Sequence, residues 1–374
     1  MRSNYKRLGQ YIRQVDVRNV DSKEDNLLGV SVQKIFIPSI ANTVGTDFTK
    51  YKVLKKGQFT YIPDTSRRGD KIGIALLEDY DEGLVSNVYT VFEIIDEHQL
   101  IPEYLMLWFS RPEFDRYARF KSHGSVREVM DWDEMCKVEL PVPSYEKQLE
   151  IVKNYRTISE RIELKRKIND NLEDSISCIF SKFFPDIVIN GKTKIKEVTD
   201  CVLGGTPSRD EPDYWGGNIA WINSGKVNDF RIISESEFIT AKGLEKSATK
   251  MLPVHTVVLA ITGATLGQES ITLIECCANQ SVVGILETPS FPYQLIHPLI
   301  KVSMKELLRN QGGGAQPHIN KDDVGNVSFN LPNKETIDIY LRSVNPLFTA
   351  IESNCHEIDE LIELESVLVA NLSR

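Results

Sequence analysis

The 374-residue sequence lacks the features that mark several classes of protein. No apolar run approaches the roughly 20 residues needed to cross a bilayer, and the opening MRSNYKRLGQYIRQ forms no apolar signal core. The 6 cysteines show no CxxC spacing and the 6 histidines no HExxH pattern. We therefore expect a cytoplasmic protein with reduced, structural cysteines, no metal site and no membrane association.

Signatures of common catalytic and nucleotide-binding sites are also missing. Three glycines at 312–314 are followed by Ala-Gln-Pro rather than by Lys-Ser/Thr, so the sequence has no P-loop. No GxGxxG motif follows a predicted strand, and no carboxylate is paired in sequence with a nucleophile. The sequence predicts a chain with no catalytic residues and no cofactor of its own.

An excess of positive charge is absent as well, because the formal net charge is −9. A protein that merely coats DNA needs clustered Lys and Arg, so this total argues against that class. The negative charge is unevenly distributed. Residues 334–374 carry 8 acidic and 3 basic side chains, and their excess of acidic residues accounts for more than half of the net charge of the chain. If that segment faces away from DNA or binds a protein, the rest of the chain is near neutral.

What the sequence does contain is an internal repeat. Residues 67–73 (RRGDKIG) align with 261–267 (ITGATLG), and at the same spacing Ser86 aligns with Gln280. Further blocks follow in the same order: 124–127 opposite 314–317, and 138–143 opposite 327–332. The length also favours two or three domains. We expect two similar α+β domains, residues 1–144 and 185–333.

Each copy of the repeat is followed by a long helical stretch. Residues 145–184 contain no Gly or Pro, and apolar residues recur there at three- and four-residue steps. Residues 334–374 show the same periodicity, although Pro346 is expected to kink or restart the helix. A helix of this size would be roughly 57 Å long, which exceeds the width of a small domain. We therefore predict two spacer helices rather than ordinary core helices.

Shorter elements are predicted within each domain. Strands are expected at 57–62, 71–77, 88–95, 219–222, 254–261 and 281–286, and helices at 101–109 and 298–308.

Polar loops at the joints of the repeat supply the candidate binding residues. In the first copy these are the basic residues Lys50, Lys52, Arg67, Arg68 and Lys71, with Ser86, Asn87 and Arg127 as candidates to read bases. In the second copy they are Thr206, Ser208, Arg209, Trp221 and Lys226, with Gln280, Ser281, Gln316, His318 and Asn320 as base readers. A solvated basic face and a tight turn with a buried Trp are the structural alternatives.

Five ordered blocks carry a resemblance to a known family. The second copy contains GGTPS at 204–208, YWGG at 214–217, GATLG at 263–267, ANQS at 278–281 and AQPHIN at 315–320. Together they resemble a target recognition domain of type I restriction–modification specificity subunits. LPVPS at 140–144, leading through Gln148, Ile151 and Val152, is similar to the family's entry into its helical region. The first copy lacks the GGTPS and YWGG blocks, so its assignment depends on the repeat.

The resemblance implies a fold and a set of partners. It implies two mixed α/β recognition domains separated by two antiparallel, coiled-coil helices with internal pseudo-two-fold symmetry. Each domain would read one half of a split site on double-stranded DNA. The chemistry would belong to partners: two methyltransferase subunits using S-adenosylmethionine for adenine-N6 methylation, and optionally restriction subunits using ATP and Mg²⁺. The acidic residues Glu357, Asp359, Glu360, Glu363 and Glu365 are our candidates for docking the methyltransferases.

Other classes of function remain open on sequence grounds. A stand-alone DNA-binding regulator is the main alternative, although the net charge opposes tight binding by an isolated chain. A coiled-coil scaffold that binds only proteins would leave the duplicated polar loops without a purpose. An enzyme acting on carbohydrates or nucleotides would need an acid–base or phosphate-binding constellation.

Overall fold

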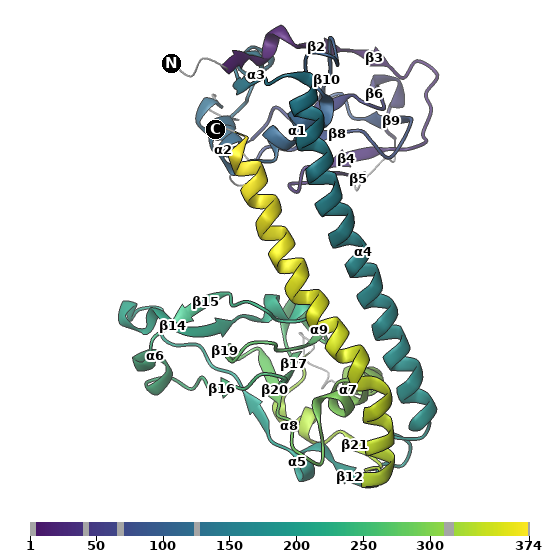
Figure 1. The fold of residues 1–374 in the computed structure, drawn as a ribbon, viewed down its shortest axis with the longest axis vertical. Helices are drawn as coiled ribbons and strands as arrows, with labels where there is room; N and C mark the ends of the chain where they lie inside the picture. The colour runs from purple at the N-terminus through teal and green to yellow at the C-terminus, as the bar shows by residue number, and fades with distance from the viewer. Residues whose placement is uncertain (1–4, 40–44, 66–70, 123–127, 310–317, 373–374) are drawn as a thin grey trace. The chain divides into compact units, whose positions relative to one another are not determined.

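The computed structural model describes residues 5–39, 45–65, 71–122, 128–309 and 318–372, and the chain divides into two compact units (Figure 1). Unit 1 consists of residues 1–162 and 361–374, and unit 2 of residues 163–360. Each of the two long helices therefore contributes residues to both units. Among the described residues, none of the helices has the length and apolar character to cross a membrane.

Unit 1 is built around a four-stranded antiparallel sheet in the order β2-β10-β7-β8. These strands are Ile12–Val15 (β2), Thr90–Ile94 (β10), Phe59–Tyr61 (β7) and Ile74–Leu76 (β8). Smaller sheets pair β1 (Tyr5–Arg7) with β11 (Glu139–Pro141), β3 (Val17–Arg18) with β6 (Lys52–Lys55) and β9 (Glu82–Val85), and β4 (Leu28–Val30) with β5 (Phe36–Pro38). The helices are α1 (Pro102–Phe109), α2 (Pro112–Lys121) and α3 (Trp132–Cys136).

Aromatic side chains fill the core of unit 1. The rings of Phe59 and Phe92, on adjacent strands, stack with centroids 4.9 Å apart, and Phe109 of α1 meets Phe59 edge-on at 5.9 Å. Leu372, just beyond the last helix, is buried in the same core. The segment after residue 360 is therefore an integral part of unit 1.

Unit 2 repeats the central sheet of unit 1 in the order β13-β20-β17-β18. These strands are Cys201–Leu203 (β13), Val282–Ile285 (β20), Val257–Ala260 (β17) and Glu269–Ile271 (β18). The β1–β11 pair also has its counterpart in β12 (Thr193–Lys194) and β21 (Ser328–Phe329). The same strand order in both copies confirms the internal repeat and the α+β class.

The second sheet of unit 2 has no counterpart of the same order in the described part of unit 1. It runs β15-β14-β19-β16 and includes a parallel pair, β14 with β19. Its strands are Trp215–Ile222 (β14), Glu237–Ile239 (β15), Met251–Leu252 (β16) and Cys276–Ala278 (β19). The helices of unit 2 are α5 (Ile195–Val198), α6 (Ala241–Glu245), α7 (Tyr293–Arg309) and α8 (Lys321–Gly325).

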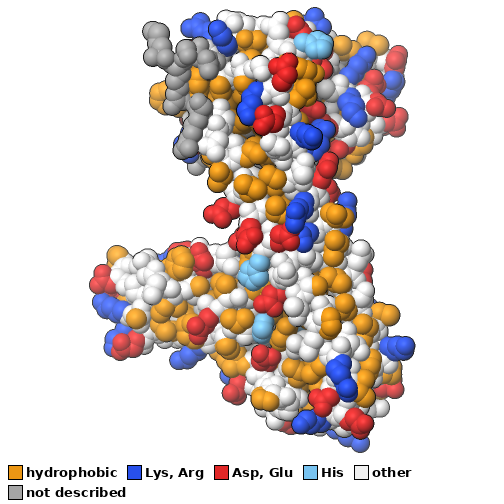
Figure 2. Space-filling view, in the orientation of Figure 1, with side chains coloured by type: hydrophobic (Ala, Val, Ile, Leu, Met, Phe, Trp, Pro, Cys, Tyr) orange, Lys and Arg blue, Asp and Glu red, His pale blue; other side chains and the backbone are white. Residues whose placement is uncertain are grey.

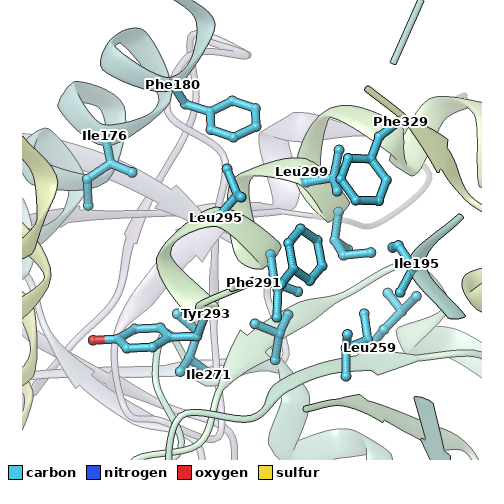
Figure 3. Close-up of a cluster of buried hydrophobic side chains, with 14 of the residues drawn as sticks. Ile176, Phe180, Ile195, Leu259, Ile271, Phe291, Tyr293, Leu295, Leu299 and Phe329 are labelled. Carbon is cyan, nitrogen blue, oxygen red and sulfur yellow. The ribbon is translucent and has the colours of Figure 1, made fainter. Parts of the chain in front are cut away.

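The core of unit 2 joins α7 to the sheet and to a long helix. Figure 3 shows Leu295 and Leu299 of α7 between Leu259 of the central sheet and Phe180 of the long helix Tyr145–Phe183. Helix α7 begins at Tyr293, earlier than the predicted residue 298, and continues through Pro298. The apolar side chains it buries outweigh the loss of one backbone hydrogen bond at that proline.

The two long helices are α4 (Tyr145–Phe183) and α9 (Lys334–Asn371). Within unit 2 they are antiparallel. Lys165 of α4 lies 2.6 Å from Glu357 of α9, and four residues further along α4, Asn169 accepts a hydrogen bond from Asn354, which precedes Glu357 in α9. The predicted restart at Pro346 is wrong, because α9 continues through it. Val344 and Phe348 on either side of that proline are buried in the core and hold the backbone in place.

A buried ionic cluster fixes α4 to unit 2. Glu173 of α4 lies 2.7 Å from the guanidinium of Arg231 and 3.5 Å from Nδ1 of His297, whose Nε2 lies 2.5 Å from Glu269. Lys301 also approaches Glu173, at 3.4 Å. Burial opposes ionisation of Glu173, but the neighbouring His297, Arg231 and Lys301 side chains outweigh it and hold the pKa of Glu173 at about 2.

We predict that Glu173→Gln strongly destabilises unit 2. The substitution leaves the buried Arg231 without its counter-ion, and breaking a buried pair in this way costs about 3 kcal/mol of the free energy of unfolding. Urea unfolding curves measure the loss. The exposed pair Lys242–Asp213 provides the control, because Lys242→Ala should hardly change the free energy of unfolding. Equal effects of the two substitutions would contradict the prediction.

The same variant should change the acid sensitivity of unit 2. Folding lowers the pKa of Glu173. Its contribution to the free energy of unfolding is therefore present above the pKa of the unfolded chain, near 4.5, and is lost as pH falls toward the folded value of about 2. The stability difference between wild type and variant should therefore shrink between pH 4.5 and 2.

Candidate nucleic-acid interface

Several loops of unit 2 meet at one edge of its central sheet. Since neighbouring strands are antiparallel, the ends of β13 and β17 lie beside the starts of β20 and β18: Leu203 pairs with Val283, and Leu259 with both Val283 and Glu269. We call this border the unit 2 edge. The loops that leave it contain the GGTPS, GATLG and ANQS blocks.

Backbone hydrogen bonds bring these blocks together. Gly204 donates to Val282 O at 3.0 Å, and Gly205 donates to Ala278 O at 2.8 Å. Ile261 donates to Ser281 O at 2.9 Å and accepts from Ile319 at 3.0 Å. Segments more than 100 residues apart in sequence therefore form one surface.

The two glycines of the GGTPS loop are required by close packing. A Cβ on Gly204 would lie 2.1 Å from Asn279 O, and one on Gly205 would lie 2.5 Å from Thr249 N. Both contacts are with backbone, which cannot rotate aside as a side chain can. These glycines let the loop pass directly over the ANQS turn.

Polar side chains project from the unit 2 edge. Thr206 and Gln280, both exposed, are hydrogen-bonded to each other, so the GGTPS and ANQS blocks share one polar surface. Ser208 and His318 are exposed and Ser281 is half-buried. Asn320 is committed to capping α8, because its side chain accepts from Asp323 N at 2.9 Å.

Arg209 is held in a fixed position beside this surface. Its guanidinium lies 3.5 Å from the ring centroid of Trp215 and donates two hydrogen bonds to Glu237, at 2.6 and 2.7 Å. The bonded carboxylate raises the pKa of Arg209, and the guanidinium lowers the pKa of Glu237. Glu237 is not predictable from the sequence, because no local motif links it to a loop 28 residues away.

Two other candidates in unit 2 have structural partners. Trp221 is 3% exposed and its Nε1 donates to Gly205 O at 3.1 Å, which supports the loop from beneath. Lys226 donates to Ser234 Oγ at 2.9 Å and pairs with Asp229 at 2.9 Å. Trp221 therefore presents almost no surface to a ligand. This agrees with the alternative interpretation of the segment as a tight turn with a buried Trp.

Unit 1 has an equivalent edge, formed by the end of β2, the start of β10, the end of β7 and the start of β8; we call it the unit 1 edge. Ser86, half-buried, and Asn87, exposed, precede β10 as Gln280 and Ser281 precede β20. Met130 donates to Pro63 O at 3.0 Å, much as Ile319 donates to Ile261 O in unit 2. The backbone arrangement recurs, while the side chains differ.

The basic residues near the unit 1 edge differ in accessibility. Lys50 and Lys71 are exposed, and Lys50 pairs with Asp47 at 3.3 Å. Lys52 is buried and donates to Tyr89 O at 2.8 Å, and burial lowers its pKa. Arg18, which sequence analysis missed, joins them by donating to Lys50 O at 3.0 Å. The strand pairing β3–β6 that places Arg18 there is too short to be visible in sequence.

Four candidate residues lie outside the described residues: Arg67, Arg68, Arg127 and Gln316.

The acidic candidates on α9 fall into two groups. Glu357 pairs with Lys165 at 2.6 Å, and Glu365 is hydrogen-bonded to Ser159, so both are engaged with α4. Asp359, Glu360 and Glu363 are exposed. Only these three are placed to meet a partner without breaking a contact between the helices.

On the face of each unit drawn in Figure 2, Lys and Arg are interspersed with Asp and Glu. No broad basic surface covers the described residues on this face. Binding of DNA here would depend on local hydrogen bonding at the edges more than on a long-range positive field. Among the described residues, no group of three or more His, Cys, Asp or Glu side chains is placed to hold a metal ion.

Comparisons with known proteins agree with this duplicated architecture. A family model described as type I restriction modification DNA specificity domain matches the sequence twice, over residues 10–174 and 190–362. The HindI specificity subunit of Haemophilus influenzae is 21% identical, covering 86% of this chain and 86% of its own length. The MjaIX specificity subunit of Methanocaldococcus jannaschii is also 21% identical, over 75% of this chain and 70% of its own.

A solved structure shares the fold. The type I restriction–modification S subunit from M. genitalium superposes with a TM-score of 0.58 at 11% identity, covering 99% of this chain and 96% of that one.

We predict that Gly204→Ala disrupts the unit 2 edge. The added methyl group would meet Asn279 O at 2.1 Å, so the backbone must shift, at a cost of about 1–3 kcal/mol. Thermal unfolding should show a lower Tm, and hydrogen exchange should increase at residues 278–282. The control is Gly29→Ala in unit 1, where the nearest atom would lie 3.6 Å away. Unchanged exchange at 278–282 would contradict the prediction.

Proposed function

Because the chain belongs to the family of type I restriction–modification DNA specificity domains and carries two of them, we propose that it reads a bipartite DNA site with one half-site per unit. The observation that carries this proposal is the duplicated sheet edge. The same backbone arrangement occurs in both units, whereas the exposed side chains differ. A shared frame with different polar groups is what two unlike half-sites require.

The chemistry at the two edges suits contact with base edges in the major groove. In unit 2, Thr206, Gln280 and Ser208 offer hydroxyl and amide groups that both donate and accept hydrogen bonds. In unit 1, Ser86 and Asn87 occupy the equivalent place, with the cations Arg18, Lys50 and Lys71 nearby for phosphate contacts. The two sets differ in charge, so the two half-sites should be contacted differently.

We propose further that the chain is a non-catalytic subunit and that partners modify the DNA. The sequence contains no P-loop and no GxGxxG motif, which supports placing S-adenosylmethionine on methyltransferase subunits and ATP with Mg²⁺ on restriction subunits. Two methyltransferase subunits, one for each half-site, match the two units. The helices α4 and α9, which contribute to both units, would set the number of base pairs between the half-sites.

The decisive experiment maps N6-methyladenine by single-molecule sequencing in cells expressing this chain with its methyltransferase subunits. We expect a split motif that disappears when this chain is omitted. Replacing residues 185–333 by the corresponding domain of a relative should change one half of the motif and leave the other half intact. Methylation that persists without this chain would overturn the proposal, and tight specific DNA binding by the isolated chain would favour a stand-alone regulator.

We also predict that the exposed acidic residues of α9 contribute to assembly. Reversing the charge of Asp359, Glu360 and Glu363 together should weaken binding of methyltransferase subunits at least tenfold, measured by isothermal titration calorimetry at low salt. The matched control replaces the same residues by Asn and Gln, which should have an intermediate effect. If both variants bind as the wild type does, this surface does not dock the methyltransferase.

A further inference from the structure

Unit 1 contains a groove that the edges described above do not use. It has a volume of about 360 Å³ and lies between the β4–β5 hairpin, α1 and the first turns of α4. We call it the helix groove. Its lining includes Phe36, Met106 and Val152, with Tyr155 and Ser159 of α4.

The floor of the helix groove is apolar. Phe36, Met106 and Val152 are only partly buried, and Ile35 at the margin of the groove is 53% exposed. These side chains retain apolar surface that another molecule could remove from water.

In the other copy of the repeat, the corresponding face of the long helix is covered. Counted from the first residue of each helix, Tyr155 and Ser159 of α4 correspond to Val344 and Phe348 of α9. In unit 2 both residues of α9 are buried, and Tyr293 packs edge-on against Phe348 with centroids 5.4 Å apart. In unit 1 the corresponding residues of α4 line an open groove.

The rim of the helix groove is acidic. Glu78, Asp79 and Glu103 lie on it, and Arg156 is shared between Glu78 and Glu103, 3.4 Å from each. One guanidinium between two carboxylates neutralises one charge at most. Partial burial raises the pKa of Glu78, and the nearby Glu103 raises it further. Another cation at the rim would therefore be favoured, whereas a phosphate backbone would be repelled.

We propose that the helix groove docks a protein segment that inserts a large apolar side chain flanked by Lys or Arg. The apolar floor accepts the side chain, and the acidic rim selects the flanking cations and excludes DNA. The inference rests on the proposed function, which supplies the partner: a methyltransferase subunit. None of the exposed acidic residues Asp359, Glu360 and Glu363 lines the groove, although Ser159 of its lining is hydrogen-bonded to Glu365 of α9.

Photo-cross-linking tests the occupant directly. Met106 is replaced by p-benzoylphenylalanine, the complex with the methyltransferase subunits is assembled and purified, and cross-linked peptides are identified by mass spectrometry. We expect cross-links to a methyltransferase segment with Lys or Arg beside a large apolar residue. The control places the same probe at Val302, an exposed apolar position on α7 of unit 2, which should not capture that segment.

A charge variant gives an independent measurement. Asp79 is exposed and the Glu78–Arg156 pair is a surface one, so replacing Glu78 and Asp79 by Lys should leave folding intact, as circular dichroism can verify. The Kd for the methyltransferase subunit should rise at least tenfold, and the Gln and Asn versions should show a smaller rise.

The outcomes separate this inference from the proposed function. An assembled complex that methylates a split motif, yet gives no cross-link from Met106 or gives one to a second copy of this chain, would overturn the groove assignment alone. An unchanged Kd for the charge variant would do the same. Failure of the wild-type chain to assemble with any methyltransferase subunit would overturn the proposed function and this inference together.

Discussion

In each unit the structure depends on one constraint, the antiparallel register of a four-stranded sheet whose strands come from distant parts of the chain. The register places the ends of the first and third strands beside the starts of the second and fourth. Loops of different length and composition are thereby gathered along one border. The backbone hydrogen bonds that maintain this border involve no side-chain chemistry, so the exposed side chains can vary between copies while the frame stays the same.

The sequence was informative where a signal is local or repeated. Apolar periodicity predicted α4 and α9 at their first residues, Tyr145 and Lys334, and the repeat predicted matching strands in both halves. It failed where tertiary packing decides. The strands β3 and β16 are two residues long, and the parallel pair β14–β19 joins distant segments. Burial of Lys52 beneath Tyr89 depends on contacts that its neighbours in sequence do not reveal.

Both units also fasten a helix with a buried ion pair. In unit 1, Lys34 of the β4–β5 hairpin lies 2.9 Å from Asp115 of α2; in unit 2, Arg231 lies 2.7 Å from Glu173 of α4. Burial lowers the pKa of Lys34, yet Asp115 remains within ion-pair distance. Such pairs contribute less to net stability than apolar packing would, but they penalise alternative arrangements that leave a charge unpaired. We infer that they help to define one orientation of each helix on its unit.

The discontinuity of unit 1 has a consequence for the order of folding during synthesis. Its core includes Leu372, which the ribosome adds only after every residue of unit 2 has been made. Unit 2, by contrast, is one uninterrupted segment and can close as soon as residue 360 emerges. The core of unit 1 therefore gains its last buried side chain only after unit 2 has been synthesised.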